Sequence, residues 1–125
     1  RLSARQGAEA LLAQATDVAG VKVIAAATEA PSIEGLREVA GWLKDKLGSG
    51  VVALGAVLEG KPQLVVMVSD DLVARGIRAG DVVKVAAMGG GGGGRPQMAQ
   101  AGGREPGRLP AALQAAVDAV RQKAG

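Results

Sequence analysis

The sequence predicts an α/β sandwich of two or three layers, in which helices flank a mixed sheet of about four to five strands. Two observations lead to this fold class. Short runs rich in Val, Leu and Ala, which suit buried strands, alternate with longer segments whose apolar residues recur at helical spacing. The chain has 125 residues, of which 48% are hydrophobic, and this is enough for one domain with one core.

In the first part of the chain we expect a helix, a strand and a second helix. Residues 1–15 are rich in Ala and predict the end of a helix, and the absence of an initial Met leads us to expect that this helix continues an upstream segment. Val21–Ala27 is a short apolar run suited to a buried strand. Pro31 and Ser32 then open a helix that Gly48 closes. Its apolar residues fall on one face: Ile33, Leu36, Val39, Ala40, Leu43 and Leu47.

The middle of the chain predicts a β-hairpin followed by short helical segments. Val51–Leu58 and Gln63–Ser69 are both rich in Val and Leu, and the turn residues 59–62 lie between them. Ser69 suits the N-cap of a short helix that begins at Asp70, because carboxylates favour the positive end of a helix. Asp81–Met88 fits either a strand, because it holds three valines, or a short helix.

The last part of the chain predicts one further strand and a helix. The strand is expected near Met98–Ala101. Leu109–Lys123 is expected to be a helix, with Pro110 in its first turn, where a missing N–H costs nothing. Its apolar residues make a narrow stripe: Leu113, Ala116, Val117 and Val120.

The most unusual feature of the chain is the segment 89–103, which reads GGGGGGRPQMAQAGG. We expect its six glycines to form a loop that another molecule approaches, because glycine has no Cβ and successive N–H groups can form an anion-binding concavity. Arg95 adds a planar charged fork suited to phosphate or to a guanine edge. A flexible linker remains the alternative. The candidate RNA-binding residues are Lys84, Gly89, Gly90, Gly91, Gly92, Gly93, Gly94, Arg95, Arg104 and Arg108.

Charge is concentrated around the glycine segment. The chain carries 15 Lys and Arg against 12 Asp and Glu, a formal net charge of +3. Residues 84–108 hold four cations and a single carboxylate, Glu105, so this short segment alone carries a net charge of +3. Such a patch favours a nucleic acid or phosphate partner. Charge that serves only solubility remains the alternative.

The composition excludes most catalytic chemistry. The chain has no His and no Cys, which removes Ser-His-Asp and Cys-His centres and all His/Cys metal sites. The pair Asp70 and Asp71 is explained by the start of a helix, so we expect no catalytic residue and no metal site. Trp42 is the single aromatic residue, and we expect it to serve packing rather than base stacking. No apolar run approaches the ~20 residues that span a bilayer, and we expect no signal peptide, because the sequence shows no pattern of that kind. We therefore expect a cytoplasmic protein without a membrane partner.

The glycine segment resembles the signature of the DHH-associated domain, which alanyl-tRNA synthetases share with the DHH phosphoesterases. Arg-Pro after the glycines, followed by Met-Ala-Gln-Ala-Gly-Gly, is similar to the synthetase form, whereas the phosphoesterases typically carry His-Pro there. Four other parts of the chain also resemble the family: residues 17–23, residues 43–48 followed by 51–54, residues 59–61 and residues 78–81. One departure is Gln97, which stands where the family usually has Asp.

The resemblance implies the C-terminal globular domain of an alanyl-tRNA synthetase, over residues 16–125, preceded at 1–15 by the stub of a helical subdomain. That domain binds the elbow of the tRNA for alanine and thereby helps the aminoacylation and editing centres act on the same tRNA. The family also uses this region in self-association. The resemblance favours a helix for Asp81–Met88.

The implied parent enzyme is an ATP-dependent alanine–tRNA ligase of protein biosynthesis. It would use ATP, Mg²⁺ and Zn²⁺ in other domains, whereas this segment would be non-catalytic and hold no cofactor. The alternative within the same family is the domain of a DHH-type phosphoesterase that binds its nucleotide or phosphate substrate.

Overall fold

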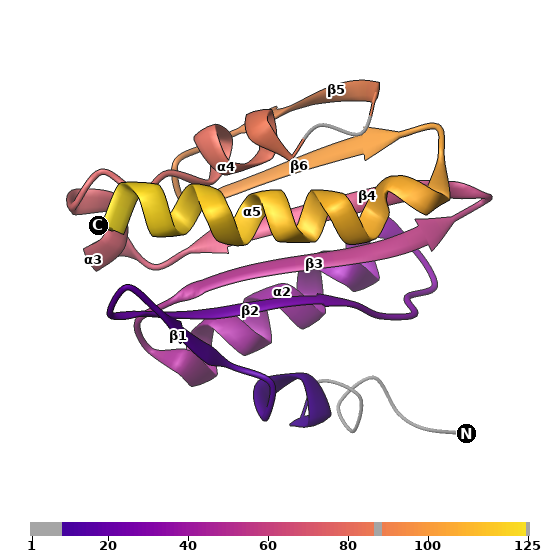
Figure 1. The fold of residues 1–125 in the computed structure, drawn as a ribbon. Helices are drawn as coiled ribbons and strands as arrows, with labels where there is room; N and C mark the ends of the chain where they lie inside the picture. The colour runs from indigo at the N-terminus through magenta and orange to yellow at the C-terminus, as the bar shows by residue number, and fades with distance from the viewer. Residues whose placement is uncertain (1–8, 87–88, 125) are drawn as a thin grey trace.

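A mixed six-stranded sheet forms the middle of the molecule (Figure 1). The computed structural model describes residues 9–86 and 89–124, so predictions for residues 1–8, 87–88 and 125 lie outside the described residues. The strands are β1 (Thr16–Val18), β2 (Val21–Ala27), β3 (Val51–Leu58), β4 (Lys61–Val68), β5 (Gly89–Gly94) and β6 (Met98–Gly103). They lie in the order β1-β2-β3-β4-β6-β5, in which β2 and β3 are parallel and the other neighbours are antiparallel.

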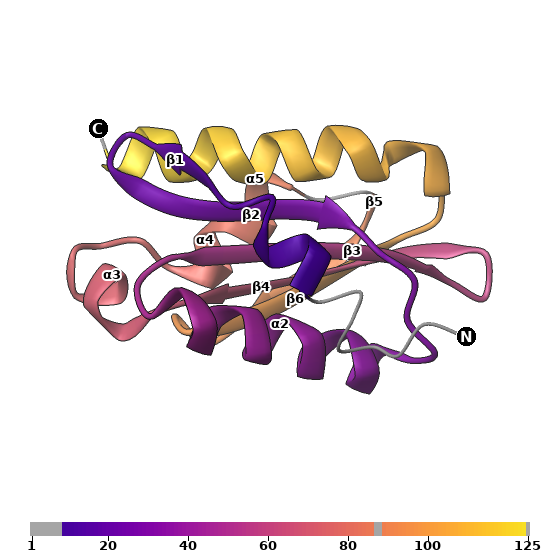
Figure 2. The same cartoon turned by 90° about the horizontal axis from the view of Figure 1, so that it is seen from below.

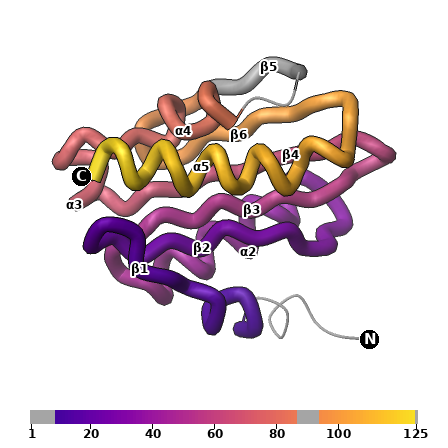
Figure 3. The backbone as a smooth tube through the Cα atoms, viewed as in Figure 1, coloured from indigo at the N-terminus to yellow at the C-terminus, as the bar shows by residue number. Residues whose placement is uncertain are grey.

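Helices cover both faces of the sheet, so the molecule has three layers (Figure 2). The helices are a short helical segment at residues 9–12, α2 (Ile33–Leu47), α3 (Asp70–Ala74), α4 (Ala79–Val85), the 3₁₀ helix η1 (Pro106–Arg108) and α5 (Leu109–Ala124). The side chains of α2 pack on one face, whereas those of α4 and α5 pack on the other. The tube in Figure 3 shows that α5, the last helix, lies over strands from the first half of the chain, so both halves share one core.

Helix α2 begins and ends where the sequence predicts. The Gly35 N–H donates to the Ser32 hydroxyl over 3.1 Å, which caps the first turn. At the other end Gly48 has a φ of 73° and its N–H donates to the Lys44 carbonyl, as expected of a glycine that terminates a helix. This helix connects the parallel strands β2 and β3, which a short turn cannot do.

The predicted hairpin is confirmed, with a tighter turn than the sequence indicates. Both Glu59 and Gly60 have positive φ, 54° and 77°, which is the geometry of a two-residue type I′ turn. Pairing therefore starts at once, and β4 begins at Lys61 rather than at Gln63. Pro62 lies within β4, just before the residues that pair with β6, so its missing N–H removes no bond from that ladder.

The side chains on the two faces of the sheet form two apolar clusters. On the α2 side the fully buried residues include Leu54, Val65 and Leu36. On the α4 and α5 side, Gly55 makes room for Leu109, because a Cβ added at Gly55 would lie 2.5 Å from the Leu109 Cδ1. The core is thus built almost entirely from aliphatic side chains, as the composition requires.

Three features of the fold differ from the expectations. The glycine run is not a loop: Gly89–Gly94 forms strand β5. The sheet has six strands rather than four or five, because β5 and the short β1 add to those predicted. Ser69 occupies the N-cap position of α3, but its hydroxyl accepts a bond from the Gly50 N–H (3.0 Å) instead of capping the helix. The mixed sheet, the strand at 98–101 and the last helix are confirmed, and Asp81–Val85 belongs to helix α4.

Candidate nucleic-acid interface

The glycine segment forms the edge strand of the sheet within the part of the chain that the structure describes. Gly92, Gly93 and Gly94 pair with Ala101, Gln100 and Ala99 of β6, and a bulge lies between Gly89 and Gly92. The opposite side of β5 has no neighbouring strand in this sheet. An edge strand presents backbone N–H and C=O groups to its surroundings, and the glycines of β5 place no side chains of their own along it.

A tight turn joins β5 to β6 and positions Arg95. The Arg95 N–H donates to the Met98 carbonyl over 2.8 Å, with Pro96 and Gln97 between them. Pro at the second position of a turn is favourable because its φ is already fixed. The residue before Arg95 has to be a glycine. Gly94 has a φ of 155°, and a Cβ added there would lie 2.6 Å from both the Ala99 Cα and the Met98 oxygen.

The turn is anchored to the rest of the fold, and this brings a second arginine close to Arg95. The Pro96 carbonyl accepts a bond from the Ala79 N–H (2.8 Å), and the Gln97 carbonyl accepts one from the Val68 N–H (2.9 Å). Arg78, which immediately precedes Ala79, is exposed, as is Arg95. Arg78 was not among the candidate residues predicted from the sequence, because it lies 16 residues before the end of the glycine run.

The other predicted cations lie elsewhere around the hairpin. Arg104 follows the far end of β6, and at ~3.3 Å per residue the strand places that end about 17 Å from the turn. Arg108 is exposed and its Nε lies 3.0 Å from the Glu105 carboxylate. Lys84 is exposed on α4, in the layer opposite α2. The structure therefore places positive charge at both ends of the β5–β6 hairpin and on the adjacent helix, and the role of these residues stays a prediction.

One face of the β5–β6 hairpin is less covered than the other. Ala99, Ala101 and Gly103 are buried on the side of α4 and α5, whereas the alternating residues Met98 and Gln100 are only half-buried. Because α2 packs on β3 and β4, the hairpin lies beyond it. We call the side of the β5–β6 hairpin that carries Met98, Gln100 and Gly102 the open face.

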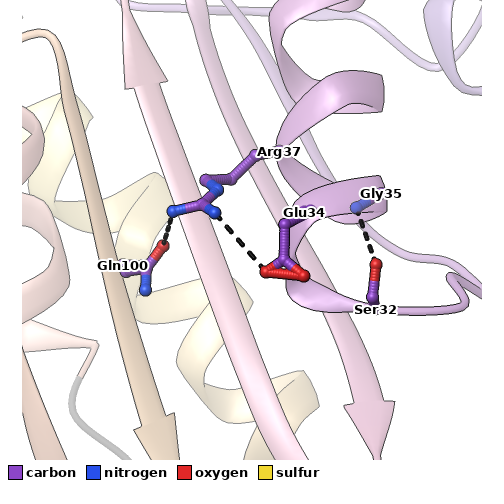
Figure 4. Close-up of polar contacts among 5 residues, drawn as sticks. All are labelled: Ser32, Glu34, Gly35, Arg37 and Gln100. Carbon is purple, nitrogen blue, oxygen red and sulfur yellow. Dashed lines mark hydrogen bonds and ion pairs between the residues drawn. The ribbon is translucent and has the colours of Figure 1, made fainter.

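Arg37 extends from α2 to the open face. Its Nη1 donates to the Gln100 Oε1 over 3.4 Å, and its Nη2 lies 3.5 Å from the Glu34 carboxylate (Figure 4). Arg37 was not among the candidate residues predicted from the sequence, because it lies in a helix 52 residues before the glycines and shows no local signal. Only the packing of α2 against the sheet reveals its position.

Trp42 and Asp71, two residues discussed for the sequence, both make contacts within the fold. Trp42 on α2 is half-buried against the apolar cluster of that face, and the Lys46 ammonium lies 5.5 Å from the centre of its ring. Asp71 accepts a hydrogen bond from the Ser49 hydroxyl, and this bond lowers the pKa of the Asp71 carboxyl below its ordinary value. Neither residue lies on the β5–β6 hairpin.

Among the described residues, no group of acidic side chains lies close enough together to hold a metal ion. No helix of this described part is long and apolar enough to span a membrane.

Residues 19–122 match the model of the DHHA1 domain family, and the signature segment 89–103 lies within the match. The chain belongs to the DHHA1 domain family. Because the match covers most of the chain, nearly the whole described fold, from β2 to α5, is this domain.

Curated proteins similar to this chain include alanine–tRNA ligases. The one from Chloroflexus aurantiacus is 51% identical over 124 residues, and the one from Roseiflexus castenholzii is 50% identical over the same length. Each match covers 98% of this chain but 14% of the relative, so the chain spans about one seventh of those proteins. The resemblance to the synthetase form of the domain is thereby confirmed.

Solved structures agree with this family. The C-Ala domain from Aquifex aeolicus alanyl-tRNA synthetase is 27% identical, with a TM-score of 0.72, and the match covers 86% of this chain and 97% of that one. RecJ from Thermus thermophilus is 18% identical, with a TM-score of 0.67 over 95% of this chain and 17% of that one. At this identity the likeness to RecJ shows a shared fold and no more.

Proposed function

We propose that this chain is the tRNA-binding C-terminal domain of an alanyl-tRNA synthetase and that it contacts the elbow of the tRNA for alanine. The observation that carries the proposal is the edge strand β5, built from glycines, in a hairpin with arginines at both ends. A backbone surface without side chains lets an RNA strand come very close, and the arginines supply charge-assisted hydrogen bonds to its phosphates.

The similarity to alanine–tRNA ligases supports tRNA as the RNA in question. In the whole protein the domain would hold the tRNA while aminoacylation and editing take place in other domains, and it would contribute to self-association. The scarcity of aromatic residues fits this role. Single-stranded RNA is usually bound by stacking its bases on aromatic rings, whereas a folded tRNA corner is recognised by shape and by close backbone contact.

A titration of this chain with two RNAs tests the proposal. Fluorescence anisotropy would compare the intact tRNA for alanine with an acceptor minihelix that lacks the elbow. We expect clearly tighter binding of the intact tRNA, and an affinity that falls with salt by roughly 0.7–0.9 log units per log unit of salt for each phosphate neutralised. Equal affinity for both RNAs would contradict the elbow assignment, and no salt dependence would contradict the role of the arginines.

The alternative is the substrate-binding domain of a DHH-type phosphoesterase. The Arg-Pro that follows the glycines and the 51% identity to alanine–tRNA ligases both favour the synthetase. The same titration with a short single-stranded oligonucleotide separates the two functions. Binding of the oligonucleotide as tight as that of intact tRNA would favour the phosphoesterase.

A further inference from the structure

The register of the sheet brings one polar residue of β6 next to the glycine strand on the open face. Val65 of β4 pairs with Gln100 of β6, and Gln100 pairs with Gly93 of β5. Residues that pair directly across strands point to the same face. Val65 belongs to the cluster under α2, so Gln100 lies on the α2 side of the sheet. The row of paired residues that runs from Val65 through Gln100 ends at Gly93, which has no side chain.

Arg37 meets Gln100 at the border between the covered and the open parts of this face. Figure 4 shows the Arg37 side chain running from α2 across a strand to the Gln100 amide. The Arg37 side chain is 36% exposed. It is therefore held between two acceptors, Glu34 and Gln100, and still reaches the surface. A guanidinium has five N–H donors, so these two contacts leave others for a ligand.

Hydrogen-bond chemistry fixes the orientation of the Gln100 amide. An arginine can only donate, so the amide oxygen must face Arg37, as the 3.4 Å contact shows. The amide NH₂ group then points away from Arg37, and its two N–H donors face away from the guanidinium (Figure 4). The two side chains together present donors beside a strand of glycines, and such a surface suits an acceptor-rich ligand.

We propose that Arg37 and Gln100 form a binding site for the ribose–phosphate backbone of RNA on the open face, beside Gly93. This inference rests on the proposed function and adds to it a contact from another helix, outside the glycine segment and its flanking arginines. Phosphate oxygens and 2′-hydroxyls accept the bonds that these side chains donate, and the absence of a side chain at Gly93 lets the RNA backbone approach. The neighbouring Glu34 carboxylate orients the guanidinium but is 66% exposed, so solvent screens its charge.

Three variants test the site, with tRNA affinity and thermal stability measured for each. Arg37→Gln removes one charge, and we expect about tenfold weaker binding, the size expected for one charged hydrogen bond. The salt slope should fall by about 0.7–0.9. Gln100→Glu places a carboxylate beside Arg37, which keeps or raises stability but repels phosphate, so affinity should again fall. The matched control is Arg121→Gln, because Arg121 also pairs with an acid three residues earlier, Asp118, on the far helix α5.

The outcomes separate this inference from the proposed function. If the unmodified chain binds tRNA, and Arg37→Gln and Gln100→Glu bind it as tightly as Arg121→Gln does, the site is wrong and the proposed function stands. If Gln100→Glu strengthens binding, the pair acts only as a structural clamp, and the site is again wrong. If the unmodified chain does not bind tRNA at all, the proposed function and the site fail together.

Discussion

Gly94→Ala is the sharpest test of how the glycine strand is built. Gly94 ends β5 at the turn that carries Arg95, with a φ of 155°, which side chains rarely tolerate. An added Cβ would lie 2.6 Å from the Ala99 Cα and from the Met98 oxygen. Both are backbone atoms of the paired strand, so no side chain can rotate to relieve the contact.

The magnitude follows from these two penalties. An unfavourable backbone conformation costs about 1–3 kcal/mol, and overpacking in a well-packed region costs about as much again. Part of this is relieved if the turn shifts, so we expect the free energy of unfolding to fall by about 2–4 kcal/mol. The free energy of unfolding of a small domain is ~5–15 kcal/mol in total, so a loss of this size is easily measured.

Urea unfolding followed by circular dichroism measures the effect, with Gly107→Ala as the control. A Cβ at Gly107 meets no atom within 4 Å, and the substitution should stabilise the protein by up to about 0.4–1 kcal/mol through the unfolded state. If the two variants have the same stability within about 0.5 kcal/mol, the geometry of the β5–β6 turn described here is wrong.

Three further predictions concern the interface and the acid stability. Arg95→Ala should weaken tRNA binding by about 1–3 kcal/mol with little change in melting temperature, because its side chain is exposed; a large loss of stability would show a structural role instead. Gly93→Ala should weaken tRNA binding while the circular dichroism spectrum stays unchanged, because register places the new methyl beside Gln100 on the open face; wild-type affinity would remove that face from the contact. The Ser49 hydroxyl lowers the pKa of Asp71 in the folded state. The ionised Asp71 therefore stabilises the fold at pH values above its unfolded-state pKa, and this stabilisation is lost as the pH falls through its folded-state pKa. The melting temperatures of Asp71→Asn and of the unmodified chain should therefore differ at neutral pH and approach each other as the pH falls below the ordinary Asp pKa of about 3.9. A difference that does not shrink over this range would contradict the prediction.

The local signals of the sequence determined most of the elements. Ser32 and Gly48 bound helix α2 as predicted, because capping depends on residues within one turn. The valine-rich runs before and after Glu59 and Gly60 formed the predicted hairpin for the same reason. The signature segment 89–103 also sufficed to recognise the family, which the comparisons confirm.

Tertiary structure alone decided the state of the glycine run and the composition of the open face. Six glycines carry no periodicity and no preference for strands, so the sequence favoured a loop, and only pairing with β6 makes them a strand. Arg37 and Gln100 are 63 residues apart in the chain, and no local pattern links them. They meet because α2 packs across the sheet and the register places Gln100 on its side, and contacts of this kind follow from long-range packing rather than from neighbouring residues.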